Sequence, residues 1–380
     1  MDTLKCPVFG KCGNCSLLNK EYSQTLKIKK DYVNSCLKKE GLNVTVNSLI
    51  GMDNPYAYRN KMIISFAYDK GRIKCGFFEE KSHKIVEIDE CLMHSSLQNE
   101  IAQFIKELVI KYKVKIYDED KRTGLLRHVL IREGYHSHEV LITFVTCELM
   151  FPSRGIIVKE IVNKFKEVKT IVQNINTRKT SIVLGEKEEV LYRNGMIEDS
   201  ILGFKFLITS KSFYQINPIQ VEKLYTLALE KANFKGNETI IDAYSGIGTI
   251  GIIASKMVKK VISVESNRDA HIAAIKNAKI NKVDNCIFYN DDATNFIKQI
   301  HDKVDAVIMD PPRSGSSYEF LKTLLKIKPR KIIYVSCGPD TLARDLKILT
   351  KNYKIESVDC VDMFCFTDHI ESIATLSLNR

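Results

Sequence analysis

Strand-like and helix-like segments alternate in the C-terminal half of this chain, and this alternation restricts the possible folds more than any other feature of the sequence. Short apolar runs that favour strands are separated by amphipathic stretches that favour helices. The alternating segments are 239–243, 247–258, 260–264, 269–280, 306–309 and 331–336. Such a pattern is typical of strand–helix–strand units, which build a doubly wound, mostly parallel sheet. We therefore predict an α/β, Rossmann-like domain over residues 196–380.

The N-terminal half has a mixed pattern. Its strand-like runs lie at 62–66, 129–131 and 140–144, and a helical stretch lies at 101–112. This pattern favours a separate α+β domain over residues 1–195, although no Pro/Gly-rich linker marks the boundary. No run approaches the roughly 20 apolar residues that a membrane span needs, and the charged start lacks the apolar core of a signal peptide. We expect a cytoplasmic protein with no membrane contact.

The chain is basic, with 57 Lys and Arg against 46 Asp and Glu, a net charge of +11. An excess of this size suits a polyanionic partner such as nucleic acid. A lysine-rich but merely solvated surface explains the same excess. Charge therefore favours a nucleic-acid partner without identifying one.

Eleven cysteines are many for a chain with no export signal. In a reducing compartment they act more often as metal ligands or reactive groups than as disulfides. Cys6, Cys12 and Cys15 lie within ten residues of one another, and with a distant fourth thiol they predict a site of four cysteines. Their spacing leaves zinc and an iron–sulfur cluster equally open, since both are held by four thiolates.

A glycine-rich turn follows the strand at 239–243. Gly246 and Gly248 allow a sharp turn and a close approach of the backbone to a ligand. Glu265 ends the next strand, where a carboxylate can bind both hydroxyls of a ribose. Asp292 follows the strand after that and is placed to meet an adenine edge. A dinucleotide and S-adenosylmethionine both fit this arrangement.

Two further strands end in residues that suit chemistry. Asp310 is followed by two prolines and Arg313, which fix the chain direction just past the sheet edge. Cys337 ends another strand, and Pro339 is suited to the first position of the next helix. Because unpaired amides and the helix dipole favour a thiolate, this position predicts a Cys337 pKa below the ordinary value of about 8.5.

These residues together resemble the RNA uracil-5 methyltransferase family, and within it the bacterial enzymes that act on 23S ribosomal RNA. The resemblance covers nearly the whole chain. Its motifs are Cys6-x5-Cys12-x2-Cys15, Tyr58-Arg-Asn-Lys61, Ser82-His83…Cys91, Ser212-Phe-Tyr-Gln-Ile-Asn217, Asp242–Gly251, Val264-Glu265, Asp310-Pro-Pro-Arg-Ser-Gly315, Tyr334-Val-Ser-Cys337 and Asp362-Met-Phe364…His369-Ile-Glu371. The chain departs from the family in starting at the cysteines without an N-terminal β-barrel, in having Ser245 for a usual cysteine, and in Gly338-Pro-Asp340 for Asn-Pro-Ala.

The resemblance implies a methyl transfer from S-adenosylmethionine to C5 of uracil in RNA. Cys337 would add to C6 of the ring, and Glu371 would remove the C5 proton. Gln215 and Asp310 would bind the methionyl part of the cofactor and the polar edge of uracil. The adenosine part would be held by Tyr244, Gly246, Glu265 and Asp292. Arg313 and Arg344 are candidates for phosphate contacts, with structural roles as the alternative.

The resemblance also implies a [4Fe–4S] cluster with Cys91 as the fourth ligand, and Cys75 is the rival. The expected substrate is 23S ribosomal RNA and the expected state a monomer. Alternatives are a tRNA uracil-5 methyltransferase, an RNA exocyclic-amine methyltransferase and a non-catalytic RNA-binding factor. The basic residues proposed for the RNA path are the lysine-rich segment 20–40, Arg59, Lys61, Lys121, Arg122, Arg127 and Arg132.

Overall fold

The computed structural model describes residues 5–80, 82–180 and 182–379, and these form two compact units. The first unit contains residues up to 20, then 55–200 and 207–211. The second unit contains residues 21–54, 201–206 and those from 212 onward. In the described part of the chain, no helix combines the length and apolar character that crossing a membrane requires.

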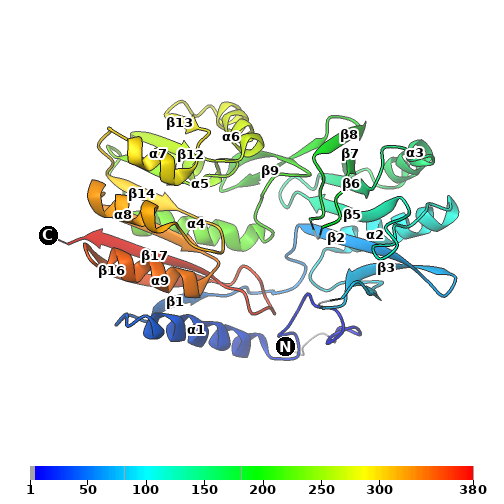
Figure 1. The fold of residues 1–380 in the computed structure, drawn as a ribbon, viewed down its shortest axis with the longest axis horizontal. Helices are drawn as coiled ribbons and strands as arrows, with labels where there is room; N and C mark the ends of the chain where they lie inside the picture. The colour runs from blue at the N-terminus through cyan, green and yellow to red at the C-terminus, as the bar shows by residue number, and fades with distance from the viewer. Residues whose placement is uncertain (1–4, 81, 181, 380) are drawn as a thin grey trace. The chain divides into compact units, whose positions relative to one another are not determined.

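An eight-stranded sheet forms the centre of the second unit (Figure 1). Its strands lie in the spatial order β1-β16-β17-β15-β14-β11-β12-β13, and all neighbours are parallel except the two pairs that include β17. The strands are β1 (Val46–Ile50), β11 (Thr239–Ala243), β12 (Lys260–Val264), β13 (Cys286–Tyr289), β14 (Ala306–Met309), β15 (Lys331–Ser336), β16 (Tyr353–Val361) and β17 (Glu371–Leu378). The predicted α/β, Rossmann-like fold is confirmed.

Helices cover both faces of this sheet (Figure 1). One face carries α1 (Tyr22–Lys39), α7 (Ala293–Gln299), α8 (Tyr318–Ile327) and α9 (Pro339–Leu349). The apolar residues of these helices form one hydrophobic core with alternate residues of the sheet strands. The other face carries α4 (Pro218–Ala232), α5 (Thr249–Ala254) with the 3₁₀ turn Ser255–Met257, and α6 (Arg268–Ile280). Because side chains alternate across a strand, Ile241 faces the first core while its neighbour Ile240 is buried on the opposite face.

The structure divides the chain differently from the sequence analysis, which assigned all of residues 1–195 to one N-terminal domain. Residues 21–54 belong to the second unit because β1 adds a parallel strand beside β16 and α1 packs on α9. Val33 and Leu37 of α1 are fully buried in that core. A sequence pattern cannot reveal this, because the pairing joins segments about 300 residues apart.

The first unit contains a seven-stranded sheet in the order β4-β3-β2-β5-β6-β7-β8, antiparallel except for the β6–β7 pair. Its elements are β2 (Lys61–Asp69), β3 (Arg72–Phe78), β4 (Ile85–Glu87), α2 (Ser96–Lys111), β5 (Leu126–Glu133), β6 (Val140–Thr146), α3 (Arg154–Lys164), β7 (Val168–Ile175) and β8 (Lys187–Tyr192). Ser95 and Gln98 form a capping box that starts α2. The next two strands along the chain, β9 (Met196–Ile201) and β10 (Phe204–Thr209), form a separate two-stranded sheet, and their residues are divided between the two units.

Candidate active site and cysteine pocket

The register of the large sheet brings three of the predicted residues to the same edge. Ala243 on β11 pairs with Val264 on β12 and with Met309 on β14. The residues that directly follow these three positions are Tyr244, Glu265 and Asp310. Since parallel strands end at the same edge of a sheet, these side chains are neighbours at the carboxyl end, where such folds bind ligands.

Cys337 and Glu371 meet at the same edge from opposite chain directions. The strand β17 runs antiparallel to β15, and Ser336 at the end of β15 pairs with Ser372. Cys337 is the next residue on one strand and Glu371 the preceding residue on the other. Consequently the thiol and the carboxyl, which lie 34 positions apart in sequence, occupy adjacent places, and both interact electrostatically with Asp310, which directly follows β14.

Three carboxyl groups are crowded together behind this edge. Asp242 and Glu371 are buried, and Asp310 keeps some exposed surface although its carboxyl group is enclosed. Burial raises the pKa of all three, to about 7 for Asp242, and Asp310 further raises the pKa of Asp242 and Glu371. Tyr225, whose own pKa is raised by burial and by these carboxylates, lies among them. An enclosed edge with this excess of acidic groups favours a positively charged ligand.

The pKa of Cys337 differs from the value that the sequence predicted. The helix N-terminus predicted a lowered pKa, but the pKa of the Cys337 thiol is raised to about 11. Burial is the main cause, followed by the carboxylates of Glu371 and Asp310, which outweigh the favourable backbone amide and Arg313. In the ligand-free protein the group is therefore a thiol, and its ionisation requires the negative field of its neighbours to be offset.

The glycine turn is held in place by Glu265. One oxygen of this carboxylate accepts a hydrogen bond of 2.9 Å from the Gly246 amide, and the other accepts one of 2.6 Å from the Asn267 amide. Gly248 has φ of +82°, in the left-handed region that glycine adopts readily. Gly251 allows α5 to pack closely, because a Cβ there would lie 2.6 Å from the Asp242 carboxylate.

Two other predicted cofactor residues have clear structural partners. The Tyr244 hydroxyl lies 3.1 Å from the Ser316 hydroxyl. Asp292 is exposed and caps α7, where one of its oxygens accepts hydrogen bonds from the amides of Thr294 and Asn295. That oxygen is committed to the helix, which leaves the second oxygen of Asp292 as the one available to a ligand.

Gln215 is buried two residues before the N-cap of α4. The cap itself, Asn217, donates a hydrogen bond of 3.1 Å to the Met363 carbonyl, and Gln220 donates one of 3.2 Å to the Asp362 carbonyl. These bonds tie the segment that carries Gln215 to the segment that leads into Glu371.

A buried ion pair holds the same segment from α1, and the sequence analysis missed it. Lys29 lies 2.6 Å from the Asp362 carboxylate, both side chains are fully buried, and its ammonium also donates to the Phe364 carbonyl at 2.9 Å. The Tyr22 hydroxyl donates to the other Asp362 oxygen at 2.8 Å. Lys29 was assigned to the RNA path with the rest of 20–40, but it is a core residue. The weak signal was its place on the apolar side of α1, beside Val33.

The two arginines proposed for phosphate contacts differ. Arg344 lies 2.7 Å from Asp345, which is fully buried, and donates to the Ser314 carbonyl at 3.0 Å, so these contacts favour the structural alternative. Arg313 is exposed beside the edge, with its guanidinium 3.4 Å from His369. Arg313 therefore remains placed to meet a phosphate.

Several basic residues proposed for the RNA path are not on the surface. Arg127 is buried and pairs with Glu119 at 2.9 Å, and Arg132 is buried as the register partner of Lys61. Burial lowers the pKa of Lys61 to about 8, with a further contribution from Arg132. These assignments were wrong for Arg127 and Arg132, because β5 is buried on both faces over Leu126–Arg132. Lys121 is exposed, and its assignment to the RNA path stays a prediction.

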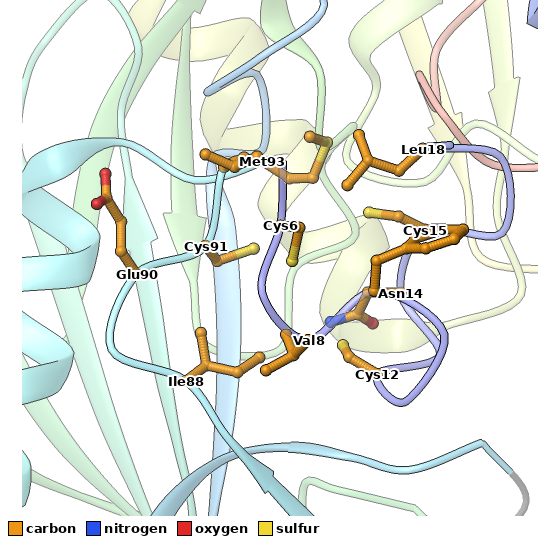
Figure 2. A pocket seen from close by; sticks show the side chains of 12 residues that line it. Cys6, Val8, Cys12, Asn14, Cys15, Leu18, Ile88, Glu90, Cys91 and Met93 are labelled. Atoms are coloured by element: carbon orange, nitrogen blue, oxygen red, sulfur yellow. The ribbon is translucent and has the colours of Figure 1, made fainter. Parts of the chain in front are cut away.

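The cysteines of the N-terminal segment share a pocket in the first unit. Figure 2 shows Cys6, Cys12 and Cys15 on the N-terminal loop, with Cys91 on the segment that follows β4. Cys75 is buried in the apolar core and is not among the lining residues. The remaining lining residues are Val8, Phe9, Asn14, Leu18, Ile88, Glu90, Leu92 and Met93.

The thiols of this pocket act on one another. Burial is the main cause that raises the pKa of Cys15 to about 12 and of Cys91 to about 11, and repulsion by the other thiolates adds to it. A bound metal would offset this repulsion between the thiolates, because metal binding requires deprotonated ligands. As they stand, no three or more His, Cys, Asp or Glu side chains in the described residues are arranged to hold a metal ion.

Residues 21–379 match the family model described as tRNA (Uracil-5-)-methyltransferase. The chain belongs to this family. An uncharacterized RNA methyltransferase of Listeria innocua is 39% identical over 98% of this chain and 83% of its own length. A second, from Halalkalibacterium halodurans, is 39% identical over 99% of this chain and 83% of its own.

A solved structure is similar over almost the whole chain. It is the tRNA (uracil-54, C5)-methyltransferase of Pyrococcus abyssi in complex with S-adenosyl-L-homocysteine. The two chains are 30% identical with a TM-score of 0.81, covering 97% of this chain and 86% of that one. The resemblance to the RNA uracil-5 methyltransferase family is therefore confirmed.

Proposed function

We propose that this protein transfers a methyl group from S-adenosylmethionine to C5 of a uridine in RNA, through a covalent bond between Cys337 and C6 of the base. The observation that carries the proposal is the sheet register, which sets Cys337 next to Glu371 at the carboxyl edge, where both groups also interact with Asp310. The similarity to a uracil C5 methyltransferase with a bound product of the cofactor supports it.

The chemistry explains why a thiol and a carboxyl must be neighbours. C5 of uracil is a poor nucleophile. The Cys337 thiolate forms a bond to C6, and the electrons of the C5–C6 double bond move to give an enolate with a nucleophilic C5. After C5 has gained the methyl group, Glu371 takes the C5 proton, the C5–C6 double bond re-forms, and the sulfur–C6 bond breaks to release thiolate. Covalent catalysis of this kind divides one difficult step into two.

The cofactor site is consistent with the same edge. When bound, S-adenosylmethionine supplies a reactive methyl group and a positive charge. Glu265 and Tyr244 would bind the adenosine part, while Gly246 admits it closely. Asp310 and Gln215 would face the methionyl part or the uracil. Asp292 would contribute only the oxygen that does not cap α7. The crowded carboxyls would attract the positive charge of the cofactor. That charge would in turn offset the carboxylates and favour ionisation of Cys337.

Trapping on RNA that contains 5-fluorouridine tests this mechanism. Fluorine at C5 cannot leave as a proton, so the enzyme should remain bound covalently and migrate as a protein–RNA adduct in denaturing gels. Cys337→Ala should form no adduct, whereas Cys147→Ala, which removes a half-buried thiol of the first unit, should form as much as the wild type. An adduct with Cys337→Ala would contradict the proposal. An amine methyltransferase or a non-catalytic factor would form none with any variant.

We propose 23S ribosomal RNA as the substrate, on the basis of the motif resemblance that includes the cysteine cluster. A tRNA substrate is the second candidate, favoured by the similar tRNA (uracil-54, C5)-methyltransferase structure. Mapping of 5-methyluridine in both RNAs from a deletion strain distinguishes them. Loss from 23S ribosomal RNA supports the first candidate, and loss from tRNA alone supports the second.

We also propose that Cys6, Cys12, Cys15 and Cys91 hold a [4Fe–4S] cluster, with zinc as the alternative. Four thiols around one pocket fit a cluster that is bound by four thiolates. Anaerobically purified protein should show broad visible absorption and about four iron atoms per chain. Cys91→Ser should lose most of this iron, and the matched variant Cys75→Ser should retain it. Loss from Cys75→Ser with retention by Cys91→Ser would reverse the assignment, and stoichiometric zinc would exclude the cluster.

A further inference from the structure

We propose that Arg59 is the counter-charge and positioning residue of the four-cysteine site, rather than a contact to RNA. This inference rests on the proposed cluster. The sequence analysis assigned Arg59 to the RNA path because it lies in a basic motif, Tyr58-Arg-Asn-Lys61. The contacts of Arg59 point instead to the cysteine pocket.

The backbone of Arg59 runs beside the segment that carries Cys91. The Arg59 amide donates to the Met93 carbonyl at 2.9 Å, and the Ala57 amide donates to the Leu92 carbonyl at 2.8 Å. Met93 and Leu92 both line the pocket directly after Cys91. Arg59 is thus fixed to the side of the pocket that supplies the fourth thiol.

The side chain of Arg59 reaches the opposite side of the pocket. Its Nη2 donates to the Asn14 carbonyl at 3.1 Å, and Asn14 lies between Cys12 and Cys15 in the N-terminal loop. Its Nε donates to the Tyr58 hydroxyl at 3.3 Å. One residue therefore links the loop that bears three thiols to the segment that bears the fourth.

The electrostatic surroundings of Arg59 match this geometry. Arg59 keeps part of its surface exposed, but its guanidinium is enclosed. The guanidinium interacts electrostatically with Cys15 and Cys91, which lie on the two sides of the pocket. An enclosed cation needs a nearby negative charge, and four thiolates around a cluster supply one. In return, the guanidinium stabilises the negative site.

This role predicts two separable effects of substitution. Arg59→Met removes the charge and both hydrogen bonds, so chelators should strip iron about 10–100-fold faster, the range typical of outer-shell residues. The reduction potential should become more negative, because the reduced cluster carries the greater negative charge and loses more stabilisation. Arg59→Lys keeps the charge but not the planar fork, so its potential should stay near that of the wild type while iron loss is still accelerated.

The experiment uses the full-length, iron-loaded protein. Iron content, the rate of iron loss to a chelator and the midpoint potential are measured for wild type, both Arg59 variants and Lys121→Met, an exposed cation of the same unit. Circular dichroism establishes that each variant is folded. If Arg59→Met does not fold, Arg59→Lys decides through its iron-loss rate.

The outcomes separate this inference from the cluster proposal. Iron-containing wild type together with unchanged potential and iron loss in Arg59→Met overturns the role of Arg59 alone. A change confined to RNA affinity and its salt dependence also overturns it, and restores Arg59 to the RNA path. Wild-type protein without iron overturns both proposals. Faster iron loss and a lower potential in Arg59→Met, with neither in Lys121→Met, support the assignment.

Discussion

Replacing Glu371 by glutamine is expected to slow turnover by about 100- to 10,000-fold and to leave methylated RNA attached to the enzyme. A glutamine cannot accept the C5 proton, and a general base contributes acceleration of this size. Addition of Cys337 and methyl transfer do not require that proton to leave. A single-turnover assay with methyl-labelled cofactor should therefore find label in RNA that remains joined to protein under denaturing conditions.

The control for this variant is Glu319→Gln, an exposed carboxyl on α8, which should turn over normally. The pH dependence gives a second readout. Burial and Asp310 raise the pKa of Glu371, and a base acts only when ionised, so release of wild-type product should accelerate as pH rises and should need a higher pH than an ordinary glutamate would. Free methylated RNA produced by Glu371→Gln at the wild-type rate would exclude Glu371 as the base.

Replacing Lys29 by methionine is expected to lower the free energy of unfolding by about 3–5 kcal/mol, the usual cost of removing one partner of a buried ion pair. The Asp362 carboxylate has no exposed surface, and without Lys29 it remains a buried charge that the hydrogen bond from the Tyr22 hydroxyl does not neutralise. Urea unfolding followed by circular dichroism measures the loss, since the chain contains no tryptophan.

The matched control is Lys27→Met, which removes an exposed lysine from the same helix and should change stability by less than about 0.5 kcal/mol. The double variant Lys29→Met/Asp362→Leu should recover part of the loss, because it removes both charges. Equal stability of Lys29→Met and Lys27→Met would show that the pair contributes little to folding.

The sequence predicted β11 to β15 of the large sheet, because buried parallel strands appear as short apolar runs, but it did not predict β1, β16 or β17. It also predicted that Glu265, Asp310 and Cys337 follow strand ends, and parallel strands bring such residues to one edge. The strand pattern alone did not place Glu371 in this group, and only the family resemblance implied its role. Glu371 begins a strand, and only the antiparallel direction of β17 puts a strand start at that edge.

Burial and electrostatics were harder to predict than element type. Arg127 and Arg132 look like surface cations in the sequence, but β5 lies between β2 and β6 and both of its faces are buried. The raised pKa of Cys337 has the same origin. Its immediate sequence neighbours predict a thiolate, while the carboxylates that oppose ionisation come from β14 and β17. Local rules describe a helix end correctly and still miss groups that approach from other strands.

The pairing of β1 with β16 limits when the sheet can be completed during synthesis and which truncated forms can fold. The ribosome releases residues 46–50 long before 353–361, so this edge of the sheet cannot close until synthesis is almost complete. A shortened gene product that starts at residue 196 would leave the backbone groups along β16 without their neighbour, and open strand edges recruit other chains. We expect such a fragment to aggregate, and we expect one that keeps residues 21–54 joined to it by a linker to stay dispersed.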